Sequence, residues 1–269
     1  MYITNDPKVA LIAEKYGVDR VWVDLETLGK AERQPGNTVK SDHSIEDIRV
    51  IKPLLKTAEM FVRINPWNES SKAEIDAVID AGADIVMLPM WKTAAEVENF
   101  IKAVAGRAKT IPLLETKEAQ ACIDEVLMLD DIDEMYIGLN DLHLSHGMTF
   151  MFELLADGTV EMLCKKIQKA GIPYGFGGIA RPGSGELPAE RVLAEHYRLG
   201  SSMVILSRSF CNTSIVTDEA EIDKTFKESI KSLRDYEKKV AAFSAEDFEN
   251  NRSEVVRCVE KIVEKLRCK

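Results

Sequence analysis

Eight short apolar segments, separated by longer segments with helical periodicity, constrain the fold of this 269-residue chain more than any other feature. Several have apolar residues at consecutive positions, which is typical of strands buried on both faces of a parallel sheet. Eight strand–helix units in about 210 residues favour an α/β fold of the (β/α)8 TIM barrel type over an open doubly wound sheet, which is the alternative. The predicted strands are Met1–Thr4, Arg20–Leu25, Met60–Ile64, Ile85–Pro89, Thr110–Leu114, Met135–Leu139, Ile172–Gly177 and Ser202–Ser207.

Two amphipathic helical segments follow the eighth strand. Phe243-Ser244 with Asp247-Phe248 predicts an N-cap and a hydrophobic staple, so the second helix should begin near Ala245. We expect a catalytic barrel domain over residues 1–216 and a C-terminal helical extension over 217–269, packed on the barrel or on a neighbouring subunit of a homo-oligomer. The apolar faces comprise Ile222, Phe226, Ile230, Leu233 and Val240 in the first helix, and Val255, Val259, Ile262 and Leu266 in the second.

Composition excludes several classes of function. A net charge of −10 without a basic patch disfavours nucleic acid and anionic membranes as partners. No apolar run approaches the roughly 18 residues that span a bilayer, and no leader precedes the first strand, so we expect a cytoplasmic protein. The five cysteines are scattered and odd in number, which favours reduced thiols over disulfides or a zinc site.

Two carboxylates follow predicted strands at positions where a barrel does its chemistry. Glu115 comes directly after Thr110–Leu114, and Asp141 comes after the strand that begins at Met135. The carboxyl ends of parallel strands lie at one edge of the sheet, and ligands of a barrel bind there. Two such acids suit a hard divalent cation with open coordination positions. The alternative is that Glu115 caps the following helix and Asp141 begins a turn.

Arg63 lies one residue before the end of the third predicted strand. A guanidinium at this edge could stabilise the enolate oxygen that develops when a carbon–carbon bond breaks next to a ketone. The alternative is a structural ion pair with Asp24, Glu26 or Glu115. Asp24 and Glu26, at the end of the second strand, could accept hydrogen bonds from Arg63 or from a bound water, or could form a salt-bridge hub.

Two loops carry further candidates. The polar loop over residues 29–43 could act as a lid, and His43 is its candidate general base, or else a solvated side chain. The glycine-rich segment over residues 175–186 could present N–H groups to an anion, or could be a flexible connection. His143 and His146 have no third metal-ligand partner nearby, so we leave them out of the metal site.

The motifs occur together and in a fixed order, and the combination resembles the HpcH/HpaI aldolase and citrate lyase beta-subunit family of the phosphoenolpyruvate/pyruvate barrel superfamily. The resemblance covers roughly residues 1 to 210. Its motifs are Asp24-Leu-Glu26, Arg63-Ile-Asn65-Pro-Trp, Ala81-Gly-Ala-Asp-Ile-Val-Met-Leu-Pro89-Met90, Leu114-Glu115-Thr116 and Ile137-Gly138-Leu-Asn-Asp141-Leu142.

This resemblance implies a lyase that holds a pyruvate-type or acyl-derived enolate on Mg2+ or Mn2+. Glu115 and Asp141 match the two metal carboxylates of the family, and Arg63 matches the arginine at the enolate oxygen. Backbone N–H groups at Asn140 and Asp141 match those that hold the substrate carboxylate. The family also implies a homo-oligomer, a hexamer or trimer of dimers, whose C-terminal helices exchange between neighbours.

Three positions depart from the aldolase pattern: Thr27 stands where the aldolases have a histidine, Leu113 where they have a glutamine, and Gly138-Leu-Asn-Asp141 where they have Gly-Pro-Ala-Asp. We therefore predict a divalent-metal-dependent carbon–carbon lyase of the aldolase type acting on a 2-oxo acid through a metal-bound enolate. His43, or a metal-bound water positioned through Glu26, would move the proton. The alternatives are a citrate-lyase-like acyl-CoA lyase and a noncatalytic ligand-binding or assembly barrel.

Overall fold

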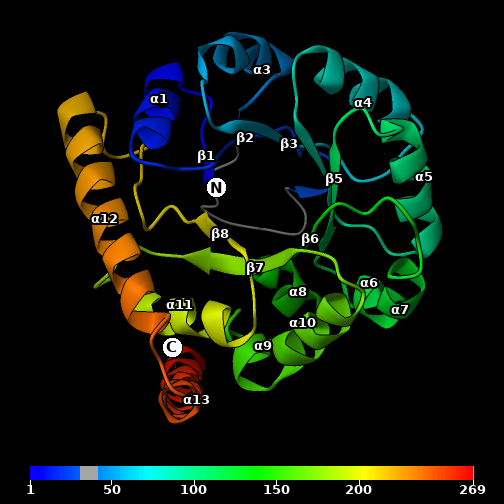
Figure 1. The fold of residues 1–269 in the computed structure, drawn as a ribbon. Coiled ribbons are helices and arrows are strands. Elements are labelled where there is room, and N and C mark those ends of the chain that lie inside the picture. The colour runs from blue at the N-terminus through cyan, green and yellow to red at the C-terminus, as the bar shows by residue number, and fades with distance from the viewer. Residues whose placement is uncertain (31–41, 269) are drawn as a thin grey trace. The chain divides into compact units, whose positions relative to one another are not determined.

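The computed structural model describes residues 1–30 and 42–268, and it contains the predicted parallel strands in the predicted order (Figure 1). The strands follow one another from β1 to β8 in a closed barrel, with helices between them. The (β/α)8 prediction is confirmed, and the open doubly wound sheet is excluded. The strands are β1 (Tyr2–Ile3), β2 (Arg20–Asp24), β3 (Glu59–Arg63), β4 (Ile85–Leu88), β5 (Lys109–Leu114), β6 (Met135–Ile137), β7 (Tyr174–Ile179) and β8 (Met203–Leu206).

The chain divides into two compact units, and the first spans Met1–Tyr136. It holds the parallel pairs from β1 to β5. Local sequence explains where its helices begin: Asp6 accepts from two N–H groups of the first turn of α1, and Thr93 forms a capping box with Glu96 before α5. The helices are α1 (Pro7–Lys15), α3 (Ile45–Ile51), the 3₁₀ turn η1 (Lys52–Leu54), α4 (Ser71–Asp80), α5 (Ala94–Val104), α6 (Lys117–Ala121) and α7 (Ile123–Val126).

Strands β2 and β3 lie side by side in the sheet, and three pairs of opposite residues, which we call the basal, middle and upper rungs, share one face. Their register sets Arg20 opposite Glu59, Trp22 opposite Phe61, and Asp24 opposite Arg63. Side chains two residues apart on a strand share a face, so one face of this pair is charged, then aromatic, then charged. The aromatic rung is an edge-to-face contact with ring centroids 4.8 Å apart.

The basal rung, Arg20 with Glu59, belongs to a larger network of ion pairs. We call this network the basal cluster, and it consists of Arg20, Glu59, Lys109 and Glu134. Arg20 contacts Glu134 through two hydrogen bonds of 2.6 Å and Glu59 at 3.1 Å. Lys109 contacts Glu59 at 2.7 Å. The cluster lies at the amino-terminal ends of the strands, the face of a barrel that serves stability rather than chemistry.

The second unit spans Ile137–Lys269. Its strands β7 and β8 are parallel, with a register shift between Gly175 and Gly178. Gly177 has a φ of +56°, and a Cβ there would lie 2.9 Å from Leu139 Cδ1, so a larger residue would need a strained backbone and a shift of the Leu139 side chain. Strand β7 therefore continues to Ile179, through glycines that the sequence analysis had partly assigned to a loop. The helices are α8 (Leu139–Ser145), α9 (Glu153–Ala156), α10 (Thr159–Lys169), α11 (Ala189–Arg198), α12 (Glu219–Val240) and α13 (Ala245–Arg267).

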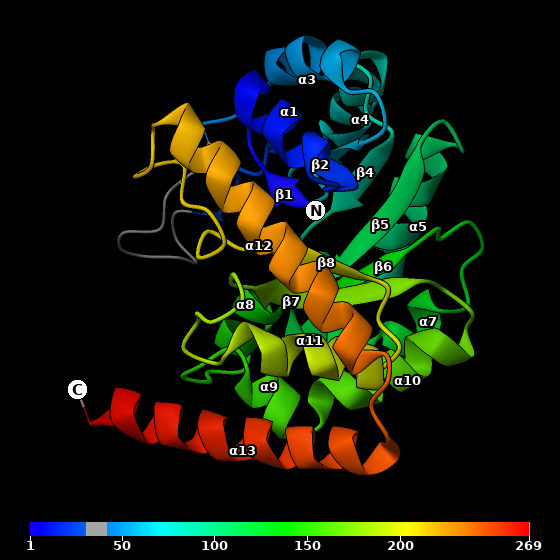
Figure 2. The same cartoon turned by 60° about the vertical axis from the view of Figure 1, so that its left-hand side comes forward.

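The two C-terminal helices form as predicted. Ser244 caps α13 in a reciprocal box with Asp247, and the rings of Phe243 and Phe248 lie 5.5 Å apart as the staple. Helix α13 packs along α11 and α9 (Figure 2). Its valine face is buried at Val255, Val259 and Val263, whereas the predicted Ile262 and Leu266 are half-buried.

A polar contact fixes the position of α13 on α11. Asn251, only 1% exposed, donates to the Arg191 carbonyl at 3.1 Å and to Glu195 Oε1 at 2.9 Å. The valine face of α13 thus has its packing partner within its own unit, and the domain boundary at 216/217 stays a prediction. In the described part of the chain, no helix combines the length and the apolar character that crossing a membrane requires.

Candidate active site

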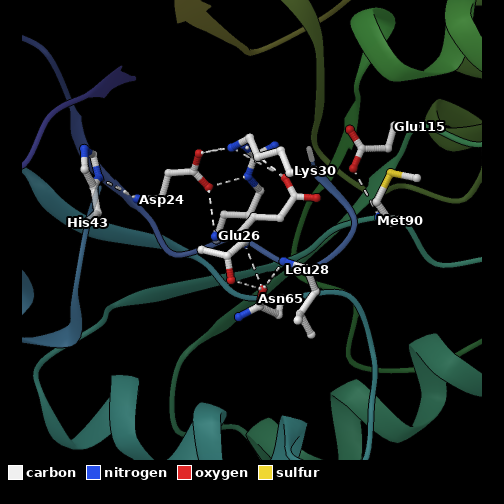
Figure 3. A network of polar contacts seen from close by, with 10 residues as sticks. Asp24, Glu26, Leu28, Lys30, His43, Asn65, Met90 and Glu115 are labelled. Carbon is white, nitrogen blue, oxygen red and sulfur yellow. Dashed lines mark hydrogen bonds and ion pairs between the residues drawn. The ribbon is translucent and has the colours of Figure 1, made fainter. Parts of the chain in front are cut away.

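A guanidinium at the carboxyl end of β3 is the centre of a polar network with the end of β2, and Figure 3 shows other members of this network, among them Asp24, Glu26 and Lys30. Arg63 donates from Nε to Asp24 Oδ1 and from Nη2 to Asp24 Oδ2, each at 2.8 Å, and its Nη2 lies 3.4 Å from Glu26 Oε2. Asp24 and Glu26 are each 2% exposed. The Trp22 ring lies 5.1 Å from Arg63 Cζ and packs against the cation. Arg63 is therefore held in one orientation.

Electrostatics keeps both members of this pair charged. Burial alone would raise the pKa of Asp24, but Arg63 and then Lys30 outweigh it and hold that pKa well below its usual range. Burial would lower the pKa of Arg63, but Asp24, Glu26 and Glu115 hold it above its usual value. Arg63 thus forms ion pairs with Asp24 and Glu26, as one of the two interpretations of its sequence position expects, while a role of Arg63 at the substrate stays a prediction.

Lys30 also forms ion pairs with Asp24 and Glu26, and the sequence analysis missed it. Its Nζ lies 2.7 Å from Asp24 Oδ2 and 3.8 Å from Glu26 Oε2. Lys30 follows β2 in a polar segment without periodicity, so no sequence pattern points to it. Trp22, by contrast, could have been found, because it lies two residues before Asp24 on the same face of the strand.

Asn65 anchors the turn that leads from Glu26 to Lys30. Its Oδ1 accepts from the N–H groups of Thr27 at 2.9 Å and of Leu28 at 3.0 Å. Its Nδ2 donates to Glu74 Oε1 at 2.8 Å. Thr27 also donates its hydroxyl to Asn65 Oδ1 at 3.2 Å.

His43 is hydrogen-bonded to the backbone of β2. Its Nδ1 accepts from the Asp24 N–H at 3.0 Å, so the neutral ring carries its proton on Nε2. Burial lowers the pKa of His43. His43 and Glu115 lie at opposite ends of the network in Figure 3. Because this bond occupies Nδ1, the geometry does not favour His43 as a base, and that role stays a prediction. The predicted lid falls largely on residues 31–41, outside the described residues.

Glu115 follows β5 and is 2% exposed. Its Oε1 accepts from the Met90 N–H at 3.1 Å, and Met90 has a φ of 54°, which is uncommon without glycine. Thr116 rather than Glu115 caps α6, since Thr116 Oγ1 accepts from Ala119 N at 3.0 Å and donates to the Trp91 carbonyl at 2.9 Å. The capping alternative for Glu115 is therefore wrong.

Asp141 belongs to the second unit and lies in the first turn of α8, where a carboxylate is favoured by the helix dipole. It is 9% exposed, and the neighbouring Asn140 is exposed. His143, on the same helix, donates from Nδ1 to the Leu139 carbonyl at 3.1 Å, as expected for a packed histidine rather than a ligand.

The donor chemistry of Glu115 and Asp141 fits a hard divalent cation. Both are buried carboxylates, and Mg2+ typically takes one or two protein carboxylates and completes its shell with water and substrate. Within residues 1–30 and 42–268, no group of three or more histidine, cysteine or acidic side chains could hold a metal by itself.

The family match and the aldolase among the similar proteins support an enzyme of the carbon–carbon lyase type. The chain belongs to the HpcH/HpaI aldolase/citrate lyase family, whose model matches residues 2–156.

Individual relatives agree with this family. The chain is 28% identical over 182 residues to a hydroxypyruvate/pyruvate aldolase of Rhizorhabdus wittichii, covering 53% of this chain and 71% of that protein. It is also 28% identical over 166 residues to a (3S)-malyl-CoA thioesterase of Cereibacter sphaeroides, covering 58% of this chain but only 53% of that protein. The crystal structure of an HpcH/HpaI aldolase from Desulfitobacterium hafniense DCB-2 matches with a TM-score of 0.63 at 17% identity, covering 84% and 92% of the two chains, which supports the fold.

Proposed function

We propose that this protein is a divalent-metal-dependent aldolase-type lyase that cleaves or forms a carbon–carbon bond in a 2-oxo acid through an enolate. The observation that carries the proposal is Arg63, a charged guanidinium whose side chain is 12% exposed and which Asp24 fixes at the end of β3. Fixed positive charge in a site with little water stabilises a developing oxyanion far more than the same charge in water does. An enolate oxygen is such an oxyanion.

Glu115 and Asp141 would hold Mg2+ or Mn2+. When bound, the cation supplies a Lewis acid that polarises the substrate carbonyl. The N–H groups of Asn140 and Asp141 lie in the first turn of α8, where the helix dipole favours an anion, and they would bind the substrate carboxylate. Arg63 would donate to the oxygen that becomes the enolate.

For a 4-hydroxy-2-oxo acid, the reaction removes the proton of the 4-hydroxyl group and breaks the bond between C3 and C4. The bonding electron pair becomes the enolate of pyruvate, the aldehyde leaves, and a proton returns to C3. Glu26, buried beside Arg63, would position the water that carries this proton. We favour Glu26 over His43 because His43 Nδ1 already accepts a hydrogen bond from the backbone.

An acyl-CoA substrate is the second candidate, favoured by the similarity to the (3S)-malyl-CoA thioesterase. Release of free CoA or of acetyl-CoA from (3S)-malyl-CoA, with no turnover of 2-oxo acids, would select it. The homo-oligomer and the cytoplasmic location expected from the sequence stay predictions, and light scattering on the purified protein tests the first.

The test of the proposed function is exchange of the pyruvate methyl protons in heavy water, followed by proton NMR with Mg2+ or Mn2+ and then with EDTA. Enolate formation predicts metal-dependent exchange. Loss of a preorganised oxyanion donor typically costs about 100-fold or more, so we expect a loss of that order in Arg63→Lys, and a comparable loss in Glu115→Gln.

Matched controls separate chemistry from folding. Arg107→Lys changes an exposed arginine paired with Asp76, and Glu118→Gln changes an exposed acid of α6, so both should exchange like the natural chain. Exchange that persists in EDTA and in both site variants would overturn the proposal. No exchange in the natural chain, combined with pyruvate binding, would favour the noncatalytic binding alternative.

A further inference from the structure

Two cations converge on one carboxylate oxygen of Asp24. Arg63 Nη2 and Lys30 Nζ contact Asp24 Oδ2 at 2.8 and 2.7 Å. The same two cations lie 3.4 and 3.8 Å from Glu26 Oε2. Figure 3 shows Lys30 and Glu26 on the same side of Asp24, with His43 on the other. Lys30 is therefore part of the charge distribution around Arg63.

The charge of Lys30 matters because Arg63 is surrounded by acids. Arg63 interacts with Asp24, Glu26 and Glu115, so an anionic substrate that approaches its guanidinium also approaches carboxylates. These carboxylates would repel the anionic substrate, and the repulsion is stronger in a site of low dielectric constant than in water. A second ammonium on Asp24 and Glu26 offsets these two acids and leaves more of the Arg63 charge for the substrate.

Lys30 follows a turn whose backbone is held by side-chain hydrogen bonds. The turn before it is fixed by Asn65, which accepts from the N–H groups of Thr27 and Leu28 and is itself bound to Glu74. The Lys30 side chain is 14% exposed. A lysine ordered in this way has already lost the side-chain entropy that an exposed lysine keeps.

We propose that Lys30 is a positioning residue of the active site, which offsets the charge of Asp24 and Glu26 so that Arg63 can bind an anionic oxo acid. This inference rests on the proposed function and deepens it, since it assigns the affinity for the substrate anion to a residue outside the barrel strands. It predicts an effect on substrate binding larger than the effect on turnover.

The test compares Lys30→Met, which keeps the aliphatic stem, with Lys30→Arg, which keeps the charge. In the pyruvate exchange assay, we expect Lys30→Met to raise KM about tenfold, with a smaller change in kcat, and Lys30→Arg to restore most of the affinity. Lys30→Gln, which keeps a hydrogen-bond donor without the charge, should behave like Lys30→Met. Lys102→Met, at an exposed pair with Glu98, should match the natural chain.

A second readout separates this proposal from the proposed function. Binding of oxalate, a planar anion shaped like the pyruvate enolate, is measured by calorimetry with Mg2+ at low salt, whether or not exchange occurs. Weaker binding in Lys30→Met and recovery in Lys30→Arg, in variants whose circular dichroism shows that they are folded at the assay temperature, would support the role of Lys30 even if exchange fails. Equal oxalate affinity in all variants, or no binding by the natural chain, would overturn it.

Discussion

At the scale of single residues, Asp24 stays charged although it is buried, because it is paired with Arg63 on the neighbouring strand. Asp24 is 2% exposed, yet Arg63 and Lys30 hold its pKa well below the usual range against the effect of burial. Removing one partner of such a pair typically costs about 3–5 kcal/mol, because the other charge stays buried. Arg63→Lys is therefore a cleaner probe of chemistry than Arg63→Ala.

The depressed pKa of Asp24 predicts how stability depends on acid. A group whose pKa is lower in the folded state stabilises the protein above its unfolded pKa, about 3.9, and this contribution is lost as pH falls below it. The gap in unfolding free energy between the natural chain and Asp24→Asn should therefore shrink by up to about 1.4 kcal/mol per pH unit below pH 4. Urea unfolding at pH 7, 4 and 3 measures this gap.

Asp76→Asn serves as the control, because Asp76 forms an exposed ion pair with Arg107. Its unfolding free energy should follow that of the natural chain through the same pH range, since exposed pairs contribute little. A gap between the natural chain and Asp24→Asn that stays constant from pH 7 to pH 3 would contradict the prediction.

At the scale of elements, polar side chains set how α11 packs against its neighbours. Asn251 connects α13 to the Arg191 carbonyl and to Glu195, while the valines of α13 supply the apolar contact. On another side of α11, His196 stacks on Phe176 of β7 with ring centroids 3.8 Å apart and shares a hydrogen bond of 2.8 Å with Ser201. Each contact leads to a prediction.

Asn251→Ala should destabilise the protein by about 1–3 kcal/mol, because it removes the amide group that binds the Arg191 carbonyl and the buried Glu195. The neighbouring Asn250 is exposed on the same helix, so Asn250→Ala should leave stability almost unchanged. Denaturant unfolding of both variants provides the comparison. Equal stability of the two variants would show that the valine face alone holds α13.

His196 predicts a second, separate loss of stability in acid. Burial lowers its pKa to about 3, whereas an unfolded histidine titrates near 6.5, so the unfolded chain takes up the proton first. Stability should fall as pH drops from 6.5 towards 4, by up to about 1.4 kcal/mol per unit, and His196→Phe should flatten this part of the curve. The exposed His146, changed to Gln, is the control. Parallel curves for the natural chain and His196→Phe would contradict this prediction.

Elements specified by local patterns could be predicted from the sequence. Consecutive apolar residues located all eight strands, and Ser244 with Asp247 located the start of α13. Strand β7 runs over Tyr174–Ile179 rather than the predicted Ile172–Gly177, and its register shift between Gly175 and Gly178 has no counterpart in the apolar pattern of the sequence. The site is predictable only where it stands at strand ends, as Arg63 and Glu115 do. Two other contacts, Lys30 with Asp24 and the Met90 N–H with Glu115, depend on the conformation of loops. The hydrophobic periodicity of the sequence does not predict loop conformation.

At the scale of the whole molecule, binding of a cation should appear as stability. A ligand that binds only the folded protein stabilises it by about 2.7 kcal/mol at 100 times its Kd. We expect Mg2+ or Mn2+ to raise the melting temperature, EDTA to reverse this, and Glu115→Gln to abolish it, while Glu118→Gln keeps it. Thermal unfolding at increasing metal concentration measures the effect. The same increase in Glu115→Gln would remove Glu115 from the metal site.

The three rungs of β2 and β3 also bear on how such a protein can change over evolutionary time. The basal rung and the upper rung are four residues apart on the strand, about 13 Å, and changes at that separation usually have additive effects. Stability can therefore accumulate at Arg20 and its partners without altering the groups around Arg63. Because of this extra stability, substitutions at the carboxyl ends of the strands could change the substrate while the ion pairs at the amino-terminal ends keep the barrel folded.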